Sequence, residues 1–237
     1  MTRREAACWV IGPSNQESKH VRWLQLDPES VARRAEAYGV SLPEPRLGRF
    51  VLRGALGFLL VSLAGFAPWT LAGSWFYQRI GEAGLYAVCA LVFIAASGPL
   101  LHRLILGPGS LPRFYCLFGV AFAGYSVAWT AAWLLMPSHT GSVIGLAAGT
   151  AFMGWVIARA FAAAAATLPV VLALFLFNAA GYFLGGVLDS VLWNLDPFPF
   201  PRDVQVILAR SSWAVLYGLG FGAGLGYAFC RVQTPRR

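Results

Sequence analysis

The chain has 237 residues, of which 58% are apolar and only 12% carry charge. Soluble domains average about 45–50% apolar and about 25% charged residues, so this composition excludes a disordered chain, a nucleic-acid-binding arm and most soluble enzymes. The net charge is nevertheless +8, and Lys19 is the one lysine among 18 basic residues. A chain that is both apolar and basic is typical of a membrane protein whose cations gather on one side of the bilayer.

Residues 1–49 are polar and are predicted to form a cytoplasmic segment with a short amphipathic helix. Asp27 is placed to cap that helix, and Pro28 suits its first position. Gly39 is predicted to stop it. Pro43 then begins an extended linker that leads to the membrane.

Beyond residue 50 the sequence predicts an all-α fold, a polytopic transmembrane helical bundle. A bilayer core takes roughly 20 apolar residues per helix. Six apolar runs meet this requirement, over residues 54–74, 84–101, 114–136, 141–158, 170–188 and 211–230. The membrane domain is therefore predicted over 50–231, with a short basic cytoplasmic tail over 232–237. The alternative fuses the fourth and fifth spans into one long helix, because Pro169 is the one strong helix breaker between them.

The charges predict how this bundle is oriented. With six spans, one side collects a net charge of +9, nine of its cations preceding residue 54, while the other side carries −1. Cytoplasmic loops carry the excess of Lys and Arg, so both termini are predicted to be cytoplasmic. The strong use of arginine with abundant alanine and glycine suggests a GC-rich genome, and thus the inner membrane of a bacterial-type cell.

Three of the predicted spans carry glycines at four-residue spacing, a glycine-zipper pattern that lets helix backbones approach closely in lipid. The helix-packing positions are Gly141, Gly145 and Gly149; Gly181 and Gly185; and Gly218, Gly222 and Gly226. Two interpretations remain open. The glycines pack helices inside one bundle, or they form a seam between copies or line a thin pore.

Ionisable and amide groups inside or near membrane spans are candidate functional residues. Asn178 lies near the middle of the fifth span. Asp189 closes that span and Arg210 opens the next, so the two could form an interhelical ion pair or contact a solute. Arg159 lies at the cytoplasmic end of the fourth span or, if that helix continues to Thr167, roughly 12 Å inside it at about 1.5 Å per residue.

The sequence predicts no catalytic residue, no cofactor site and no metal site. His102 and His139 are expected on opposite faces of the membrane, so they cannot ligate one haem together. The four cysteines lack CxxC spacing, and neither HExxH nor a phosphate-binding loop is present.

Two function classes follow. The first is a non-catalytic subunit or scaffold of a membrane assembly, with the lipid bilayer and other membrane chains or further copies as partners and no nucleic acid. The second is a small transporter or channel for a neutral or weakly polar solute, whose path would involve Asn178, Tyr182 and Tyr125. An enzyme acting on a lipid is a third, more distant class. A transporter requires a polar cavity that reaches Asn178.

Overall fold

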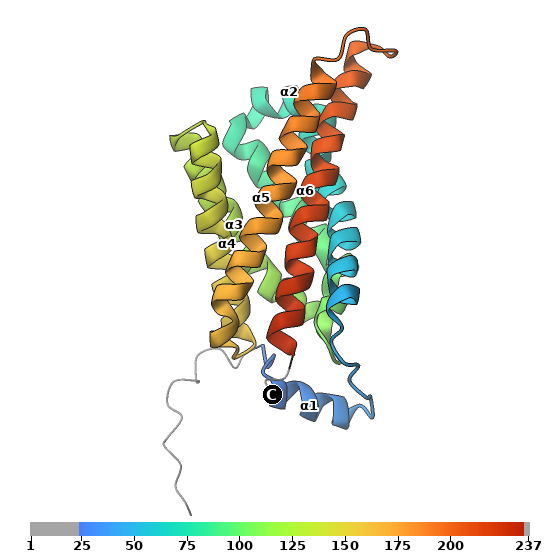
Figure 1. Ribbon diagram of the computed structural model, residues 1–237, viewed down its shortest axis with the longest axis vertical. Coiled ribbons are helices and arrows are strands. Elements are labelled where there is room, and N and C mark those ends of the chain that lie inside the picture. The colour runs from blue at the N-terminus through green and yellow to red at the C-terminus, as the bar shows by residue number, and fades with distance from the viewer. Residues whose placement is uncertain (1–23, 235–237) are drawn as a thin grey trace, which may run out of the picture.

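The computed structural model describes residues 24–234, which form helices and no strand (Figure 1). Predictions that concern residues 1–23 and 235–237 lie outside these described residues. The elements in chain order are α1 (Pro28–Ala37), α2 (Leu47–Leu101), the 3-10 turn η1 (His102–Leu104), α3 (Ser110–Leu135), α4 (His139–Ala160), the 3-10 turn η2 (Ala164–Ala166), α5 (Thr167–Trp193) and α6 (Arg202–Gln233).

Helix α2 contains both of the first two predicted spans, and they run antiparallel. A Cβ atom added at Gly57 would meet Leu101, and one added at Gly65 would meet Phe93, so the two arms lie side by side. The helix is interrupted at Ala72 and at Gly81, whose φ of +71° favours glycine. Residues 75–83, between the first two predicted spans, thus form no separate loop, because the chain reverses through the two breaks within α2.

The fourth and fifth predicted spans are separate helices, so the single long helix considered as an alternative is wrong. The chain turns before Pro169: Ala162 takes a positive φ of +53°, and η2 leads into α5. Pro169 lies in the first turn of α5, where its missing N–H leaves no intrahelical bond unmade. Arg159 consequently lies in the last turn of α4 with an exposed side chain, and not deep inside a continuing helix.

Helix α6 begins nine residues earlier than predicted, at Arg202, because polar side chains support its first turns. The Nε2 atom of Gln205 donates to the carbonyl oxygens of Leu192 and Leu195, at 2.8 and 2.9 Å. These bonds tie the start of α6 to the end of α5. An apolar-run criterion could not have found this polar extension.

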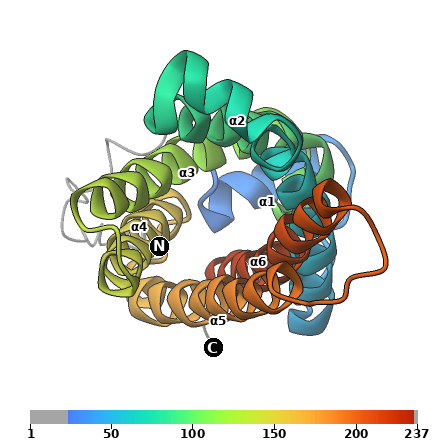
Figure 2. The ribbon, with the colours of Figure 1, turned by 90° about the horizontal axis from the view of Figure 1, so that it is seen from above.

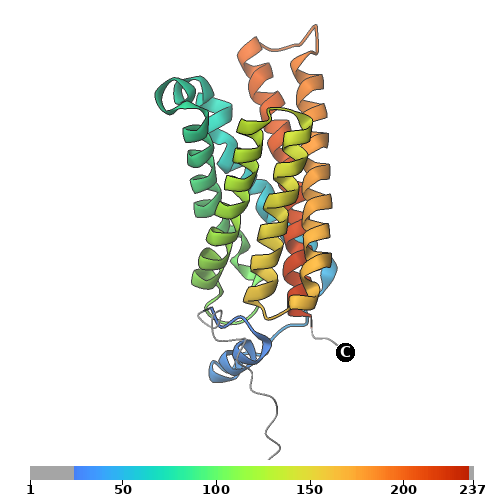
Figure 3. The same cartoon turned by 90° about the vertical axis from the view of Figure 1, so that its left-hand side faces the viewer.

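The long helices form a ring when seen along the bundle axis, and α1 lies beneath the ring (Figure 2). Figure 3 shows α1 at one end of the bundle, which we call the α1 end; the opposite end, with the α3–α4 and α5–α6 connections, is the far end. The half of the bundle nearer α1 has a dense aromatic core. The Phe58 and Phe221 rings lie 4.7 Å apart and the Phe118 and Phe122 rings 5.1 Å apart.

Within residues 24–234, five helices are long and apolar enough to cross a membrane, the first of them being α2 together with η1. Large apolar side chains also cover the outside of the bundle. Val127 is 69% exposed, Leu91 66% and Leu176 62%. Lipid tails are as apolar as these side chains, whereas in water such faces would favour aggregation. The fold is thus that of a multi-pass membrane protein.

The predicted N-terminal helix is confirmed as α1. The Asp27 carboxylate accepts a hydrogen bond from the Ser30 backbone N–H at 2.9 Å, and Gly39 follows the helix with a φ of +61°. The Arg113 side chain donates from Nε to the carbonyl oxygen of Leu24 at 2.9 Å, which ties the start of this segment to α3. Val31 is buried and contributes to holding α1 against the bundle.

Candidate ligand-binding cavity

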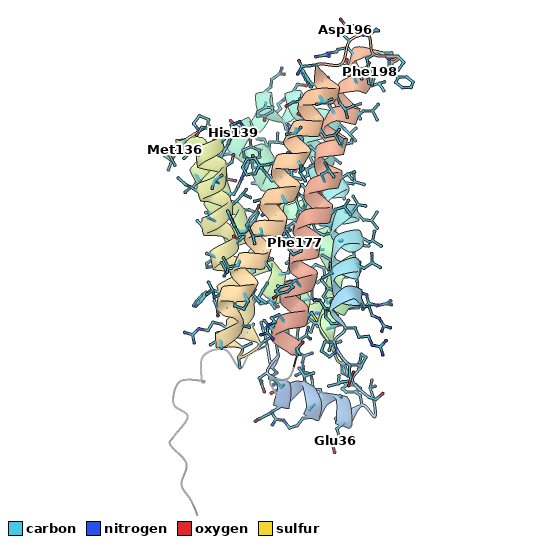
Figure 4. The ribbon with its side chains drawn as sticks, in the orientation of Figure 1. Glu36, Met136, His139, Phe177, Asp196 and Phe198 are labelled. Carbon is cyan, nitrogen blue, oxygen red and sulfur yellow. The ribbon has the colours of Figure 1, made fainter. Side chains whose placement is uncertain are left out.

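A partly open cavity of about 1090 Å³ lies among both arms of α2 and helices α3, α4, α5 and α6. It occupies the far half of the bundle. His139, which lines it, lies near the end opposite Glu36 of α1 (Figure 4). This volume is slightly larger than the range of typical ligand pockets, about 300–1,000 Å³. The lining is formed by 27 residues.

Aromatic side chains dominate the lining. Thirteen of the 27 residues are Phe, Trp or Tyr, although these types make up 14% of the whole chain. The Trp129 and Trp133 rings are nearly parallel, with centroids 6.0 Å apart, and Tyr86 meets Trp129 edge-on at 5.6 Å. On the opposite wall Trp213 stacks on Tyr217 at 5.2 Å. The cavity therefore presents flat, polarisable faces to a bound molecule.

A buried hydrogen-bond network closes the cavity toward the α1 end. The Tyr125 hydroxyl accepts from the Asn178 side-chain nitrogen at 2.9 Å and from the Tyr217 hydroxyl at 3.3 Å. Both tyrosines line the cavity, whereas Asn178 is fully buried behind Tyr125. The oxygen Oδ1 of Asn178 has no hydrogen-bond partner. The structure thus brings together Asn178, Tyr125 and, in the adjoining wall, Tyr182. Among the described residues, the polar cavity that was expected to reach Asn178 is not found, because the cavity is largely aromatic and ends at Tyr125.

The carboxylate of Glu82 is fixed in the wall by two donors on neighbouring elements. Its Oε1 atom accepts from the Tyr86 hydroxyl at 2.6 Å and from the Trp133 indole N–H at 3.1 Å. Both bonds involve the same oxygen, so the second oxygen is left for other partners. The hydrogen bond from Trp133 also links α2 to α3. Glu82 was not singled out from the sequence, although it is the one acidic residue between Glu44 and Asp189.

Asp189 and Arg210 lie together in a smaller adjoining pocket of about 350 Å³, and Asp189 also lines the main cavity. The hydrogen bond of Arg210 does not go to Asp189. Its Nη1 donates to the carbonyl oxygen of Trp69 at 2.9 Å, and its guanidinium lies over the Trp69 ring at 4.9 Å. The Asp189 oxygen Oδ1 is buried without a hydrogen-bond partner. Arg210 thus joins α6 to α2, and Asp189 keeps an unpaired acceptor.

Two further polar features belong to the wall. The Trp129 indole N–H is buried and has no acceptor. The hydroxyls of Ser142 and Tyr182 lie 3.2 Å apart and connect α4 to α5. Trp129 thus keeps an unused donor and Asp189 an unused acceptor, both buried in the wall beside the cavity.

The predicted packing glycines lie at helix contacts outside this cavity. Gly222 faces Gly54 of the first arm of α2, and on the opposite side of α6 Gly220 faces Gly181 of α5. Each predicted position approaches a neighbouring helix of the same chain: Gly141, Gly145 and Gly149 face α3, Gly185 faces Trp213, and Gly218 and Gly226 face α2. Nothing but hydrogen fits between these backbones.

Within residues 24–234, no three His, Cys, Asp or Glu side chains lie close enough together to hold a metal ion. His102 and His139 lie at opposite ends of the bundle. Comparison of the chain with family models, with curated proteins and with solved structures finds no match. A functional assignment therefore depends on the cavity itself.

Proposed function

We propose that this chain is a small transporter of a bacterial-type inner membrane, with six spans and both ends in the cytoplasm, and that it binds a small, largely apolar solute. The observation that carries this proposal is the partly open aromatic cavity of about 1090 Å³, which lies in the far half, whereas buried side chains fill the α1 half. A one-sided cavity in a helical bundle corresponds to one state of an alternating-access cycle.

The charge distribution supports the orientation. Among the described residues, the α1 end carries nine arginines and four acidic residues, whereas the far end carries three arginines and four acidic residues. Cytoplasmic loops hold the positive excess. This assigns the α1 end to the cytoplasm and the far end to the outside. The two arms of α2 then count as two spans.

The subunit hypothesis was favoured by the glycine ladders, by the absence of charges in the middle of the spans and by the missing catalytic residues. The first of these supports it less, because the glycines meet helices of the same chain. A cavity lined by fixed polar groups is more specific to a protein that holds a solute.

The floor of the cavity consists of side chains, Phe122, Tyr125 and Tyr217, so rotamer changes and helix tilting could open it from below.

Binding is tested by filling the cavity. Gly186 lines it, and an added Cβ atom would meet only the Trp213 nitrogen, at 4.0 Å. Gly186→Leu should therefore fold normally and exclude solute. The matched control is Gly119→Leu, where an added Cβ atom would meet only Ile94 at 4.0 Å and which lies outside the cavity lining. N-phenyl-1-naphthylamine, an uncharged apolar fluorophore, should bind the wild type and the control but not Gly186→Leu. Equal binding by all three contradicts the proposal.

The side of access is tested by labelling. Ser126 lines the cavity and can be changed to cysteine after the native cysteines are replaced by alanine. A membrane-impermeant maleimide should label Ser126→Cys from outside intact cells, and the fluorophore should protect it. Slower labelling in inverted membranes is expected if the protein alternates. Labelling from the cytoplasmic side alone contradicts the proposed orientation.

A further inference from the structure

We propose that the solute is an organic cation, with an amine or quaternary ammonium group on an apolar body, held by Glu82 and Asp189 in the aromatic cavity. This assignment rests on the proposed function and specifies the substrate class of the same site. The feature that carries it is the presence of two carboxylates in an aromatic wall whose lining, as far as the structure describes the chain, contains neither Lys nor Arg.

The first step is the charge balance of the cavity. Glu82 and Asp189 give it two acidic groups. Arg210 shares the adjoining small pocket with Asp189 and offsets part of that charge. Its hydrogen bond and its ring contact are nevertheless with Trp69. A charge in an apolar site needs an opposite charge or hydrogen-bond partners. Glu82 has donors but no cationic partner in the lining, so a cationic solute completes the site.

The second step is that Glu82 is positioned in advance. The Tyr86 hydroxyl and the Trp133 indole both donate to Oε1, at 2.6 and 3.1 Å. Donors that bind a carboxylate fix its direction. Two donors on α2 and α3 thus hold a negative charge at the cavity wall without neutralising it. An uncharged acceptor in place of Glu82 would not need two donors to hold it in the cavity wall.

The third step is the aromatic surrounding. Trp and Tyr faces attract cations, and this attraction is stronger where water is excluded. Trp133 touches Glu82 through its N–H and stacks on Trp129, and Tyr86 touches both Glu82 and the Trp129 ring. The Glu82 carboxylate and the rings of Tyr86, Trp129 and Trp133 thus border the same part of the cavity. An anionic solute would meet the Glu82 carboxylate there, and a neutral one would leave that carboxylate without a cationic partner.

The experiment compares two molecules of the same shape. Benzyltrimethylammonium and neopentylbenzene differ in one atom, a positively charged nitrogen in place of carbon. Their affinities are measured by quenching of tryptophan fluorescence with the full chain in an uncharged detergent. We expect the wild type to bind the cation at least about tenfold more tightly, which corresponds to about 1.4 kcal/mol. This comparison needs no variant.

Variants then locate the preference. Glu82→Gln keeps an oxygen that can accept both hydrogen bonds but removes the charge, so it should abolish most of the preference for the cation. Asp189→Asn should reduce it less, because Arg210 already offsets Asp189. The matched control is Asp203→Asn, which removes the same charge from the first turn of α6, outside the lining. It should leave the preference unchanged.

The outcomes are separable. Equal affinities of the wild type for the two molecules overturn the cation assignment and leave the proposed function intact. An equal loss in Glu82→Gln and Asp203→Asn overturns it as well. Failure of both molecules and of the uncharged fluorophore to bind removes the proposed function itself. Added phosphatidylcholine distinguishes the sources of the ammonium group: displacement of the bound cation identifies a lipid headgroup, and no displacement identifies a free solute.

Discussion

The two halves of this bundle use the same helices and much the same aromatic residues, yet one half is packed and the other encloses a cavity. Three stacked aromatic rings on helix α6 extend from the half with the cavity into the packed half. Trp213 stacks on Tyr217 at 5.2 Å and Tyr217 on Phe221 at 5.7 Å. Trp213 and Tyr217 line the cavity, whereas Phe221 is fully buried in the packed core.

The partners of these rings explain the difference. In the α1 half, Gly222 and Gly226 let α6 approach the first arm of α2, and phenylalanine rings fill the remaining space. In the far half, the wall consists of Trp and Tyr side chains whose polar atoms need hydrogen-bond partners. Hydrogen bonds such as the one from the Trp133 indole N–H to Glu82 join two helices through their side chains and not through close contact of their backbones. Glycine contacts thus bring α6 and the first arm of α2 together in the α1 half, whereas a side-chain hydrogen bond joins α2 to α3 beside the cavity.

The sharpest test of this contrast compares one phenylalanine from each half. Phe58 is fully buried among the rings of the α1 half, and Phe58→Ala should lower the free energy of unfolding by about 3–5 kcal/mol. Phe183 already borders open space, so Phe183→Ala should cost about 1 kcal/mol. Equilibrium unfolding in detergent measures both. Equal losses would show that the two halves are packed alike.

The next test crowds a backbone contact. An added side chain at Gly222 would strike the Gly54 carbonyl and Phe58, so Gly222→Leu should destabilise the bundle by about 3 kcal/mol or more. Gly48→Leu is the control, because a Cβ atom there meets nothing within 4 Å. The apparent melting temperature should fall for the first variant only. An unchanged melting temperature in Gly222→Leu would mean that the close helix contact does not stabilise the packed half.

How well the sequence predicts each half follows from the same physics. Glycine spacing and apolar runs are local patterns, so they located the long helices and the glycines at the contacts between them. The start of α6 was missed because its support, Gln205 bonded to carbonyls of α5, involves residues distant in sequence. The reversal of the chain within α2 was missed because it occurs at a single glycine, Gly81, and not in a separate loop.

The cavity was only partly predictable. Asn178 and Asp189 stood out because polar groups in apolar runs are conspicuous, and Tyr125 was placed on the same path. Glu82 and Trp133 did not stand out, since both lie near predicted span ends, where such residues are ordinary. Their pairing depends on how α2 and α3 meet, which no pattern within either helix specifies.

A third test addresses the boundary between the halves. Tyr125→Phe removes the hydroxyl that accepts from Asn178 and Tyr217, and leaves two buried donors unpaired. The loss should be about 2 kcal/mol. Tyr115→Phe is the control, because the Tyr115 hydroxyl donates to the Ala95 carbonyl at an exposed site. Thermal unfolding should separate the two. If both variants melt alike, the Tyr125 network does not help to close the cavity floor.

The smallest expected effect is confined to α1, which covers the end of the packed half. Partial burial raises the pKa of Asp27, but hydrogen bonds from Ser30 and the nearby Arg33 outweigh it, so the pKa lies below the usual 3.8. The cap therefore contributes its full stability above pH 3.8 and loses it as pH falls through the lowered pKa. Asp27→Ala should destabilise α1 by about 1 kcal/mol at neutral pH. Hydrogen exchange of the α1 amides measures this, and fluorophore binding should stay unchanged because the cavity lies at the other end. A simultaneous loss of binding would show that the two halves are coupled.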